Sequence, residues 1–473
     1  MKFTILSHAG ILIEHNGVQI ISDPWLIGSC YWRSWWNFPE SPRLILESIK
    51  PDYIYLTHLH WDHFHGPSLQ KFFDPDVRIL VPKVPTRRMV ENLNWLGFQN
   101  ITEIEHNGEF RLGEDFTLRS YQFGLGTDSA MLVSGGGTTL FNCNDCKSFG
   151  LPLKQITKRY PKIDFVFRSH SSASPIPYCI EDYEATFSDF RKPGDYIDEF
   201  SYFALFVDAR YAIPFASNHC FLHKETFHFN NSTVSPNIIP TRYQEIAKGM
   251  NKKSECIVMS PGSSWSQSNG FEIVSFDYSN KDAYLLELLE RYNDKLETQY
   301  RKEAETLADF ELFRSYFEDF MNAIPFIVRN YFKLQIIFQT FDQRGEHYWL
   351  IDTIVRDIKV LKNNNNMYPT IKTPALVLND CCKQKMFSTW PASKRLKIYL
   401  PSASHLKFVN IFFLLLDLYE LDSLPLIKNF TWRSLSVRLL RWREVLEVIH
   451  IFFKYVLLKR PFIIKNLWKD SGT

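Results

Sequence analysis

A dense group of metal-binding residue types, His58-x-His60-x-Asp62-His63, constrains this chain more than any other feature. It follows the apolar run Tyr53 to Leu56, which predicts a short buried strand. A helical pattern comes next, so we expect the group on a strand-to-helix loop. Alternate residues at a strand end point the same way, so His58 and His60 can bind one ion, while Asp62 and His63 can reach a second. Imidazole and carboxylate groups suit zinc, iron and manganese, and they favour a metal site here over a solvated polar loop.

Strand and helix patterns alternate along the first half of the chain, which predicts a layered α/β arrangement. The triplet Gly135-Gly136-Gly137 is expected to be a hairpin turn, because no helix start or lysine follows it as in a phosphate loop. The stretch from Phe3 to Ile13 is predicted to form one apolar strand, and a helix is predicted from Thr86 to Leu96. Further strands are expected at Val18 to Ser22, Val77 to Val81, Phe116 to Tyr121, Ala130 to Val133, Thr138 to Phe141, Phe165 to Phe167 and Tyr211 to Phe215.

The pattern changes at about Asp282, where apolar residues recur at helical spacing and charged residues occupy the other side. We therefore expect two domains, residues 1–278 for metal binding and residues 279–473 as an accessory α+β or mostly helical domain. The first helix is expected to continue towards Phe317. Later elements are predicted as strands at Phe332 to Phe338 and Trp349 to Val355, and as helices at Phe412 to Leu418 and Trp442 to Leu457. In the last helix the apolar side is predicted to pack in the core through Trp442, Val445, Leu446, Ile449 and Phe452.

Charge and composition restrict the partners. The chain has 54 basic and 52 acidic residues, a net charge of +2, so no strong overall field attracts nucleic acid or an anionic membrane. We expect a small-molecule substrate that is held locally. No transmembrane segment is expected, because the most apolar window, around Ile411 to Leu416, is far shorter than the roughly 20 residues that cross a bilayer. The 8 cysteines and the strand-like start predict a reducing compartment, the cytoplasm. No pattern predicts the oligomeric state.

The segment from Thr57 to Gly66 resembles the HxHxDH signature of the metallo-β-lactamase superfamily. The segments His8-Ala9-Gly10 and Ser22-Asp23-Pro24-Trp25-Leu26 resemble the opening of the branch that contains N-acylphosphatidylethanolamine phospholipase D and related lactonases. A closer likeness, over roughly residues 1 to 275, is to the hydrolase-like portion of CMP-N-acetylneuraminate hydroxylase. The resemblance implies a four-layer αββα sandwich. The closer likeness is carried by Asp23 to Leu26, Trp35-Trp36, Asn142 to Cys146, Ala173-Ser174 and Pro214-Phe215-Ala216.

The resemblance also implies a set of metal ligands. His58 and His60 would bind one ion, Asp62 and His63 a second, and Asp145 would bridge the two. The last ligand is expected near residues 217–223, where His219 is preferred and His223 is the alternative. Residues 121–128 lack the histidine that the branch has there. An asymmetric or single-ion site, with His170 as substitute ligand or substrate contact, is therefore a second interpretation.

The leading functional hypothesis is a hydrolase in which one or two zinc ions, or iron, activate water against a phosphodiester, ester or lactone. Asp62 would orient or deprotonate that water. The alternatives are a non-haem iron oxygenase acting on a nucleotide sugar or related metabolite, and a binding protein with a degenerate metal site. The Rieske pattern of two Cys-x-His pairs is absent from this sequence, so an oxygenase would take electrons from a partner or use iron directly. The aromatic residues Tyr31, Trp32, Trp35, Trp36 and Phe38 are expected either to wall the pocket or to form core.

Overall fold

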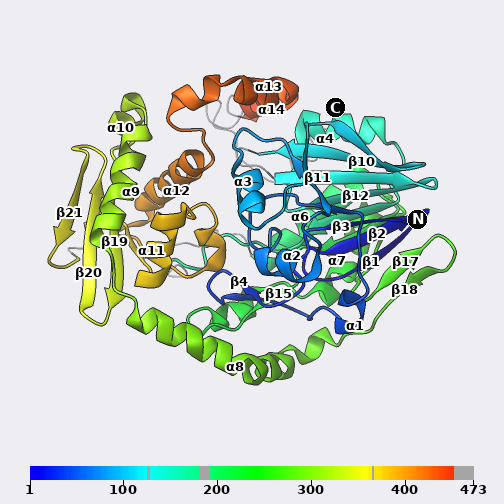
Figure 1. The fold of residues 1–473 in the computed structure, drawn as a ribbon, viewed down its shortest axis with the longest axis horizontal. Coiled ribbons are helices and arrows are strands. Elements are labelled where there is room, and N and C mark those ends of the chain that lie inside the picture. The colour runs from blue at the N-terminus through cyan, green and yellow to red at the C-terminus, as the bar shows by residue number, and fades with distance from the viewer. Residues whose placement is uncertain (125–127, 182–191, 365–366, 452–473) are drawn as a thin grey trace.

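Two facing β-sheets form the centre of the N-terminal part of the chain (Figure 1). The computed structural model describes residues 1–124, 128–181, 192–364 and 367–451. The first sheet contains β1 (Lys2–Ile5), β2 (Ile11–His15), β3 (Val18–Ser22), β6 (Tyr53–Tyr55), β7 (Arg78–Pro82), β8 (Ile101–Ile104), β17 (Ser264–Ser266) and β18 (Gly270–Glu272). The second sheet contains β9 (Gly108–Gly113), β10 (Phe116–Phe123), β11 (Asp128–Gly135), β12 (Thr138–Asn144), β13 (Phe165–Ser169), β14 (Tyr211–Phe215) and β16 (Glu255–Cys256).

The two sheets are packed between helices, so the N-terminal part has four layers in the order αββα. Between the sheets, Phe3 and Ile13 of the first sheet pack against Val133 and Phe167 of the second. The outer face of the first sheet is covered by α2 (Gly66–Phe72) and α3 (Arg88–Trp95). The outer face of the second is covered by α4 (Gly150–Arg159), α6 (Pro193–Val207) and α7 (Ile239–Gly249). The expected sandwich is confirmed, and so is the hairpin turn at Gly135 to Gly137, because Gly135 pairs with Thr138.

The prediction of one strand from Phe3 to Ile13 was wrong. The segment forms two antiparallel strands, β1 and β2, which pair from Lys2 with Glu14 to Ile5 with Ile11. The chain reverses at Leu6 to Gly10, where the Gly10 N–H donates to the Ser7 hydroxyl at 3.2 Å. A β-carbon on residue 10 would lie only 2.5 Å from that hydroxyl, so any other residue would have to displace the Ser7 side chain and break this bond. The reversal puts His8 on a loop at the end of the sheet.

The C-terminal part contains a five-stranded sheet, in the order β21-β20-β19-β22-β23, and several helices. The sheet is built by β19 (Gln335–Asp342), β20 (Gly345–Asp352), β21 (Asp357–Leu361), β22 (Thr370–Lys372) and β23 (Lys397–Tyr399). The helices are α8 (Lys281–Glu305), α9 (Phe310–Ala323), α10 (Phe326–Phe332), α11 (Ala375–Gln384), α12 (Leu406–Glu420), α13 (Trp432–Leu440) and α14 (Trp442–Ile451). This part is α+β, and its boundary near residue 278 stays a prediction.

Two predicted elements of this part differ from the structure. The helix expected to run to Phe317 stops at Glu305, and a new helix begins after Asp309, whose carboxylate accepts from the Leu312 N–H at 3.0 Å. That N-cap explains the break. The strand expected from Phe332 begins instead at Gln335, because α10 occupies the preceding residues.

Trp442, Val445, Leu446 and Ile449 of α14 are 46–58% exposed, so their predicted core packing was wrong. The helix packs on the N-terminal part through its carboxylates instead, with Glu444 accepting from the Gly124 N–H and Glu447 from the Leu151 N–H. Phe452 and the remainder of the predicted helix to Leu457 lie outside the described residues. Within the described ranges, no helix is long and apolar enough to cross a membrane.

Candidate metal centre

The histidine-rich segment lies on the loop between β6 and α2, as expected. The loop follows the end of a buried parallel strand, and it leads into the helix through His65, whose Nδ1 accepts from the Ser68 N–H at 3.2 Å. His58, Asp62, His63 and His65 are all buried. The short strand, the tight loop and the capped helix hold the side chains of the histidine-rich segment at one end of the first sheet, beside the end of β12.

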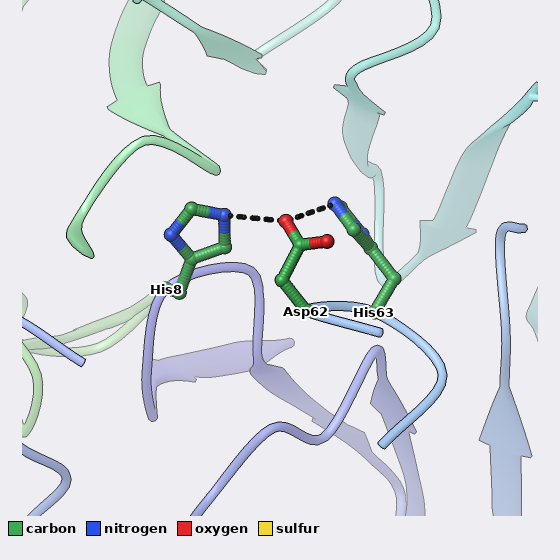
Figure 2. Close-up of side chains that lie close together, drawn as sticks. All are labelled: His8, Asp62 and His63. Carbon is green, nitrogen blue, oxygen red and sulfur yellow. Dashed lines mark ion pairs between the residues drawn. The ribbon is translucent and has the colours of Figure 1, made fainter. Parts of the chain in front are cut away.

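Two groups of donor atoms meet at this end of the sheets. In one group, donor atoms of His58, His60 and Asp145 all lie within 4.8 Å of one another. In the other group, the same holds for His8, Asp62 and His63 (Figure 2). The two groups adjoin, because His63 Nε2 lies 3.4 Å from Asp145 Oδ2. The structure thus brings together the five ligands implied for the two ions and adds His8.

His8 is the site residue that the sequence reasoning missed. Its Nε2 lies 3.1 Å from Asp62 Oδ2, and His63 Nε2 lies 3.3 Å from the same oxygen (Figure 2). The loop is held in place by the His8 N–H, which donates to the Asn37 side chain at 3.1 Å. A histidine two residues before a glycine, at the turn of an opening hairpin, was the available signal, but the predicted continuous strand concealed it.

The donor set fits a bound metal ion. His8 Nδ1 is buried and has no hydrogen bond to the described residues, while His8 Nε2 and His63 Nε2 face the Asp62 and Asp145 carboxylates at 3.1–3.4 Å without hydrogen-bond geometry. Buried polar atoms are normally paired, and an unpaired one costs roughly 1–3 kcal/mol. Ring nitrogens that face the Asp62 and Asp145 carboxylates in this way are arranged as metal ligands would be.

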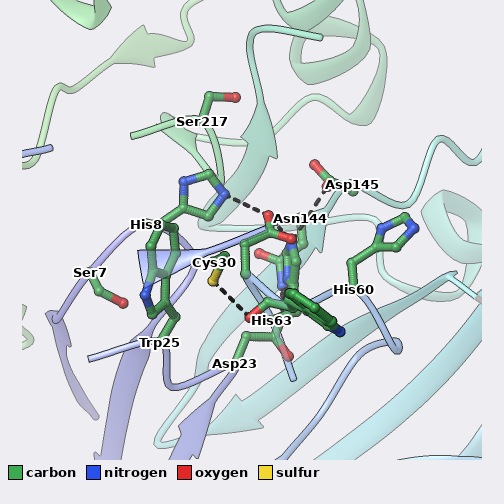
Figure 3. A network of polar contacts seen from close by, with 12 residues as sticks. Ser7, His8, Asp23, Trp25, Cys30, His60, His63, Asn144, Asp145 and Ser217 are labelled. Carbon is green, nitrogen blue, oxygen red and sulfur yellow. Dashed lines mark hydrogen bonds and ion pairs between the residues drawn. The ribbon is translucent and has the colours of Figure 1, made fainter. Parts of the chain in front are cut away.

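Asp23 fixes the orientation of His63 from below the site (Figure 3). Its Oδ2 accepts from His63 Nδ1 at 2.8 Å, from the Thr57 hydroxyl at 2.7 Å and from Asn144 Nδ2 at 2.5 Å. Its Oδ1 accepts from the Thr57 N–H at 2.8 Å. A carboxylate on the far nitrogen of a histidine sets the ring tautomer and turns the near nitrogen towards the metal position.

Burial and charge set the protonation of these groups. Burial lowers the pKa of His58 and of His60 to about 4, so both rings are neutral near pH 7, the form in which imidazole binds metals. Burial also disfavours charge on His63, but Asp62 and Asp23 outweigh it and raise the pKa of His63 well above its ordinary value. Burial acts to raise the pKa of Asp62, and His63 and His8 overcome that effect and hold it low. The electrostatic field at the site therefore favours a bound cation.

The remaining predicted residues lie around the two groups. His219 begins β15 (His219–Phe221) and stacks on Trp35, with ring centroids 3.6 Å apart, and it belongs to neither group. His170 is buried with both ring nitrogens unpaired, and its backbone N–H donates to Ser217 Oγ. His223 points to the C-terminal part, with its Nε2 3.4 Å from Glu303 Oε2.

Two cavities border the donor groups. A cavity of about 1040 Å³ is lined by His58 and His60 together with α3 and with Met386, Asp417 and other residues of the C-terminal part. A smaller cavity of about 380 Å³ is lined by Asp62, Asp145, His219 and a serine-rich segment at 169–174. Asp128 borders both cavities. The segment that lacks the expected histidine adjoins them, but residues 125–127 lie outside the described ranges.

The aromatic segment serves both of its expected roles. Tyr31 is buried, and its hydroxyl donates to Asp62 Oδ1 at 2.5 Å. Trp35 lines the smaller cavity. Trp36 and Phe38 instead pack in a separate core against α8. Backbone φ angles of +53° to +65° at residues 31–33, which lie just before β5 (Trp35–Asn37), are strained for side chains of this size and bring the Tyr31 phenol onto the site.

Comparison with known families agrees with this arrangement. Residues 2–132 match the beta-lactamase superfamily domain. A Mycobacterium tuberculosis protein named as a putative Rieske 2Fe-2S iron-sulfur protein is 31% identical over 253 residues, which is 51% of this chain and 48% of that protein. The cytidine monophosphate-N-acetylneuraminic acid hydroxylase of Xenopus laevis is 30% identical over 160 residues, which is 31% of this chain and 26% of the enzyme.

The chain spans about half the length of the first of these relatives, and less of the hydroxylase. Among solved structures, the isothiocyanate hydrolase from Delia radicum gut bacteria aligns with 56% of this chain and 99% of its own, at 14% identity and a TM-score of 0.39.

Proposed function

Because its N-terminal part belongs to the metallo-β-lactamase superfamily, we propose that this chain is a metal-dependent hydrolase that uses activated water on a phosphodiester, ester or lactone. One observation supports the proposal above all: two adjoining groups of His and Asp donor atoms face cavities large enough for a metabolite. The Nε2 atoms of His8 and His63 converge on Asp62 Oδ2, and His8 Nδ1 is buried without a hydrogen bond to the described residues, which supports a bound ion at this group.

In this proposal His58, His60 and Asp145 hold one ion, and His8, Asp62 and His63 hold a second. Such an ion, zinc or iron, would supply Lewis acidity, which polarises the group under attack and makes water a better nucleophile. His219 lines the smaller cavity together with Asp62 and is proposed as a further ligand or a substrate contact. His170 stays proposed as a substitute ligand or substrate contact. His223 is assigned no role at the metal, because it pairs with Glu303.

The protein's own groups orient the reactants. Asp62 is the proposed catalytic residue, because it belongs to the second group, lines the smaller cavity and has one oxygen fixed by the Tyr31 hydroxyl. The Tyr31 bond leaves the second oxygen, Oδ2, facing His8 and His63. Asp62 would then orient water towards the substrate and accept its proton.

Residues 279–473 are proposed as an accessory domain that closes the site. Met386, Asp417 and Leu421 line the larger cavity opposite His58 and His60, so the substrate pocket depends on both parts. Apolar side chains, including Trp61 and Phe64 of the N-terminal part, make up much of the lining of this cavity. A substrate with an apolar or aromatic portion beside its reacting group fits this lining.

Metal content and turnover test the proposal. Elemental analysis of protein from its native host should find one or two zinc or iron ions per chain, and a screen of phosphodiester, ester and lactone substrates should find turnover. His60→Ala should lower both metal content and turnover. His228→Ala removes an exposed histidine away from the site and should change neither. Full turnover by His60→Ala or by Asp62→Ala would refute the hydrolytic proposal.

An iron enzyme that acts on a nucleotide sugar is the second candidate, because the matched relatives carry the names of a Rieske protein and a hydroxylase. This sequence has no Cys-x-His pair, so this candidate would take electrons from a partner or use iron directly. Bound iron with an optical or spin-resonance signature, in protein without hydrolytic turnover, would favour this candidate. Protein purified gently without any metal would instead favour a binding protein with a degenerate site.

A further inference from the structure

The last described elements of the chain present apolar side chains to solvent. We define the apolar C-terminal face as the outward side of residues 426–451, which comprise a short 3₁₀ helix, α13 and α14. Ile427, Phe430, Trp432, Leu439, Trp442 and Ile449 on this face are 48–85% exposed. Contiguous exposure of this extent is typical of a surface that binds something, and single exposed apolar residues are not.

An ordinary surface helix turns its polar side to solvent, but α14 turns its apolar side to solvent. Glu444 accepts from the Gly124 N–H at 2.8 Å, and Glu447 accepts from the Leu151 N–H at 3.0 Å. The approach of Glu447 depends on Gly150, where an added β-carbon would lie 2.2 Å from the Glu447 carboxyl carbon. The carboxylates therefore anchor the helix, and the anchoring turns its apolar side outward.

Helix α13 is anchored in a similar way. Arg433 donates to the Val84 carbonyl at 2.8 Å and to the Glu103 carboxylate at 2.9 Å. Both helices are thus held to the N-terminal part by polar bonds on their inner sides. The apolar side chains are therefore exposed because of the orientation in which both helices are attached, and not because a helix is detached.

The charge on and around the face is positive. Residues 426–451 include five basic and two acidic residues. Lys428, Arg433 and Arg441 pair with Asp422, Glu103 and Glu444, which leaves Arg438 and Arg443 without an acidic partner among the described residues. The Arg443 guanidinium lies over the Trp442 ring at 4.4 Å, which places a cation at the edge of the apolar side chains. The sequence after residue 451 adds five basic residues and one acidic residue among many aromatic and aliphatic ones.

This charge discriminates between the surfaces that could cover the face. A second copy of the chain would bring two positive surfaces together, and like charges across an interface oppose association. The following segment of the same chain is also positive. A bilayer with anionic headgroups complements both properties, because apolar and aromatic side chains enter the interface while Lys and Arg stay at the headgroups.

We infer that the apolar C-terminal face binds the surface of a bilayer that contains anionic phospholipids. The whole-chain charge of +2 gave no indication of this, because the acidic residues that balance the charge lie elsewhere on the molecule. The inference concerns a surface outside the metal centre and does not rest on the proposed hydrolytic function.

Vesicle co-sedimentation of the full chain tests the inference. The vesicles are phosphatidylcholine alone and a 70:30 mixture of phosphatidylcholine and phosphatidylserine. Wild-type protein should bind the mixed vesicles more tightly, and the binding should weaken as NaCl is raised. Replacing two face residues, Trp432→Ser with Ile449→Ser, should lower binding at least tenfold. Leu286→Ser is the matched control, because Leu286 is 64% exposed on α8, at the opposite edge of the molecule in Figure 1.

A second variant tests charge without altering apolar area. Arg438→Gln with Arg443→Gln should lower binding to the mixed vesicles by roughly 30-fold and leave binding to phosphatidylcholine alone unchanged. If the serine variant does not fold, this charge variant still tests the inference. Equal binding of wild-type protein to both vesicle types would overturn the inference. A lack of vesicle binding, with a dimer in light scattering that the serine variant dissociates, would show that a second copy covers the face and would also overturn it.

Discussion

The strongest prediction concerns Asp23, which we expect to control metal affinity without touching the metal. Asp23 is fully buried and accepts four hydrogen bonds, three on Oδ2 and one on Oδ1. In Asp23→Asn the new NH₂ group must replace one of these two oxygens. At the Oδ2 position it would face the donors of His63 and Asn144, and at the Oδ1 position it would face the Thr57 N–H.

The less costly orientation places the NH₂ group at Oδ1. It leaves the buried Thr57 N–H unpaired, which costs roughly 1–3 kcal/mol, and converts the charge-assisted bond to His63 into a neutral one, which loses about 1 kcal/mol more. We therefore expect Asp23→Asn to lower the free energy of unfolding of metal-free protein by about 2–4 kcal/mol. Metal affinity should fall about 10- to 100-fold, because the His63 ring loses its fixed tautomer and part of its basicity.

Urea denaturation of metal-free protein measures the first effect, and competition with a chromophoric chelator measures the second. Asp52→Asn is the matched control, because exposed Asp52 also accepts a backbone hydrogen bond, from the Gln19 N–H at 2.8 Å. We expect it to change stability by no more than about 0.5 kcal/mol and to leave metal affinity unchanged. An Asp23→Asn protein that is destabilised as expected but binds zinc and iron as tightly as wild type would refute the role of Asp23 behind His63.

Three further predictions follow from buried polar groups. Tyr31→Phe should cost about 2 kcal/mol in urea denaturation, because a hydrogen bond to the buried Asp62 carboxylate is lost. Glu303 is partly buried, but its bonds to His223 and Arg395 lower its pKa to about 2, so its contribution, up to roughly 3 kcal/mol, should vanish as pH falls from about 4.5 to 2. Glu303→Gln should therefore flatten the acid limb of the stability curve. Burial, with Glu420 and Asp128, raises the pKa of Asp417 to about 8. The unfolded chain then ionises first, so Asp417→Asn should raise Tm more at pH 8 than at pH 4.

Much of the sandwich could be predicted from sequence because its signals are local. The strands after residue 76 and the helix before Trp95 follow apolar periodicity, and the glycine triplet at residues 135–137 has the chemistry of a hairpin. The motif from His58 to His63 was located correctly on its loop for the same reason, since strand, loop and helix are consecutive in the chain. The approach of Asp145 was an expectation from resemblance, because the residues between it and His63 carry no local signal of contact.

The turn that presents His8 could not be predicted from local sequence signals. Leu6 and Ile11 flank it with apolar side chains, so a hydrophobicity pattern continues across the reversal. The reversal depends on the bond between Ser7 and Gly10 and on the pairing of β1 with β2 and β17. Those contacts exist only once the sheet has formed, so the sequence indicates His8 only through the family resemblance and not as a ligand.

The last helix exposes a more general limit. The spacing of Trp442, Val445 and Ile449 correctly indicated an amphipathic helix, but periodicity only divides a helix into two sides. Which side faces the protein was decided by the backbone N–H groups of Gly124 and Leu151, which lie about 300 residues earlier in the chain and require carboxylate partners. Because the protein satisfies those donors with Glu444 and Glu447, the apolar side of the helix faces away from the described part of the chain. The positive charge around that side is the reason to expect an anionic lipid surface there.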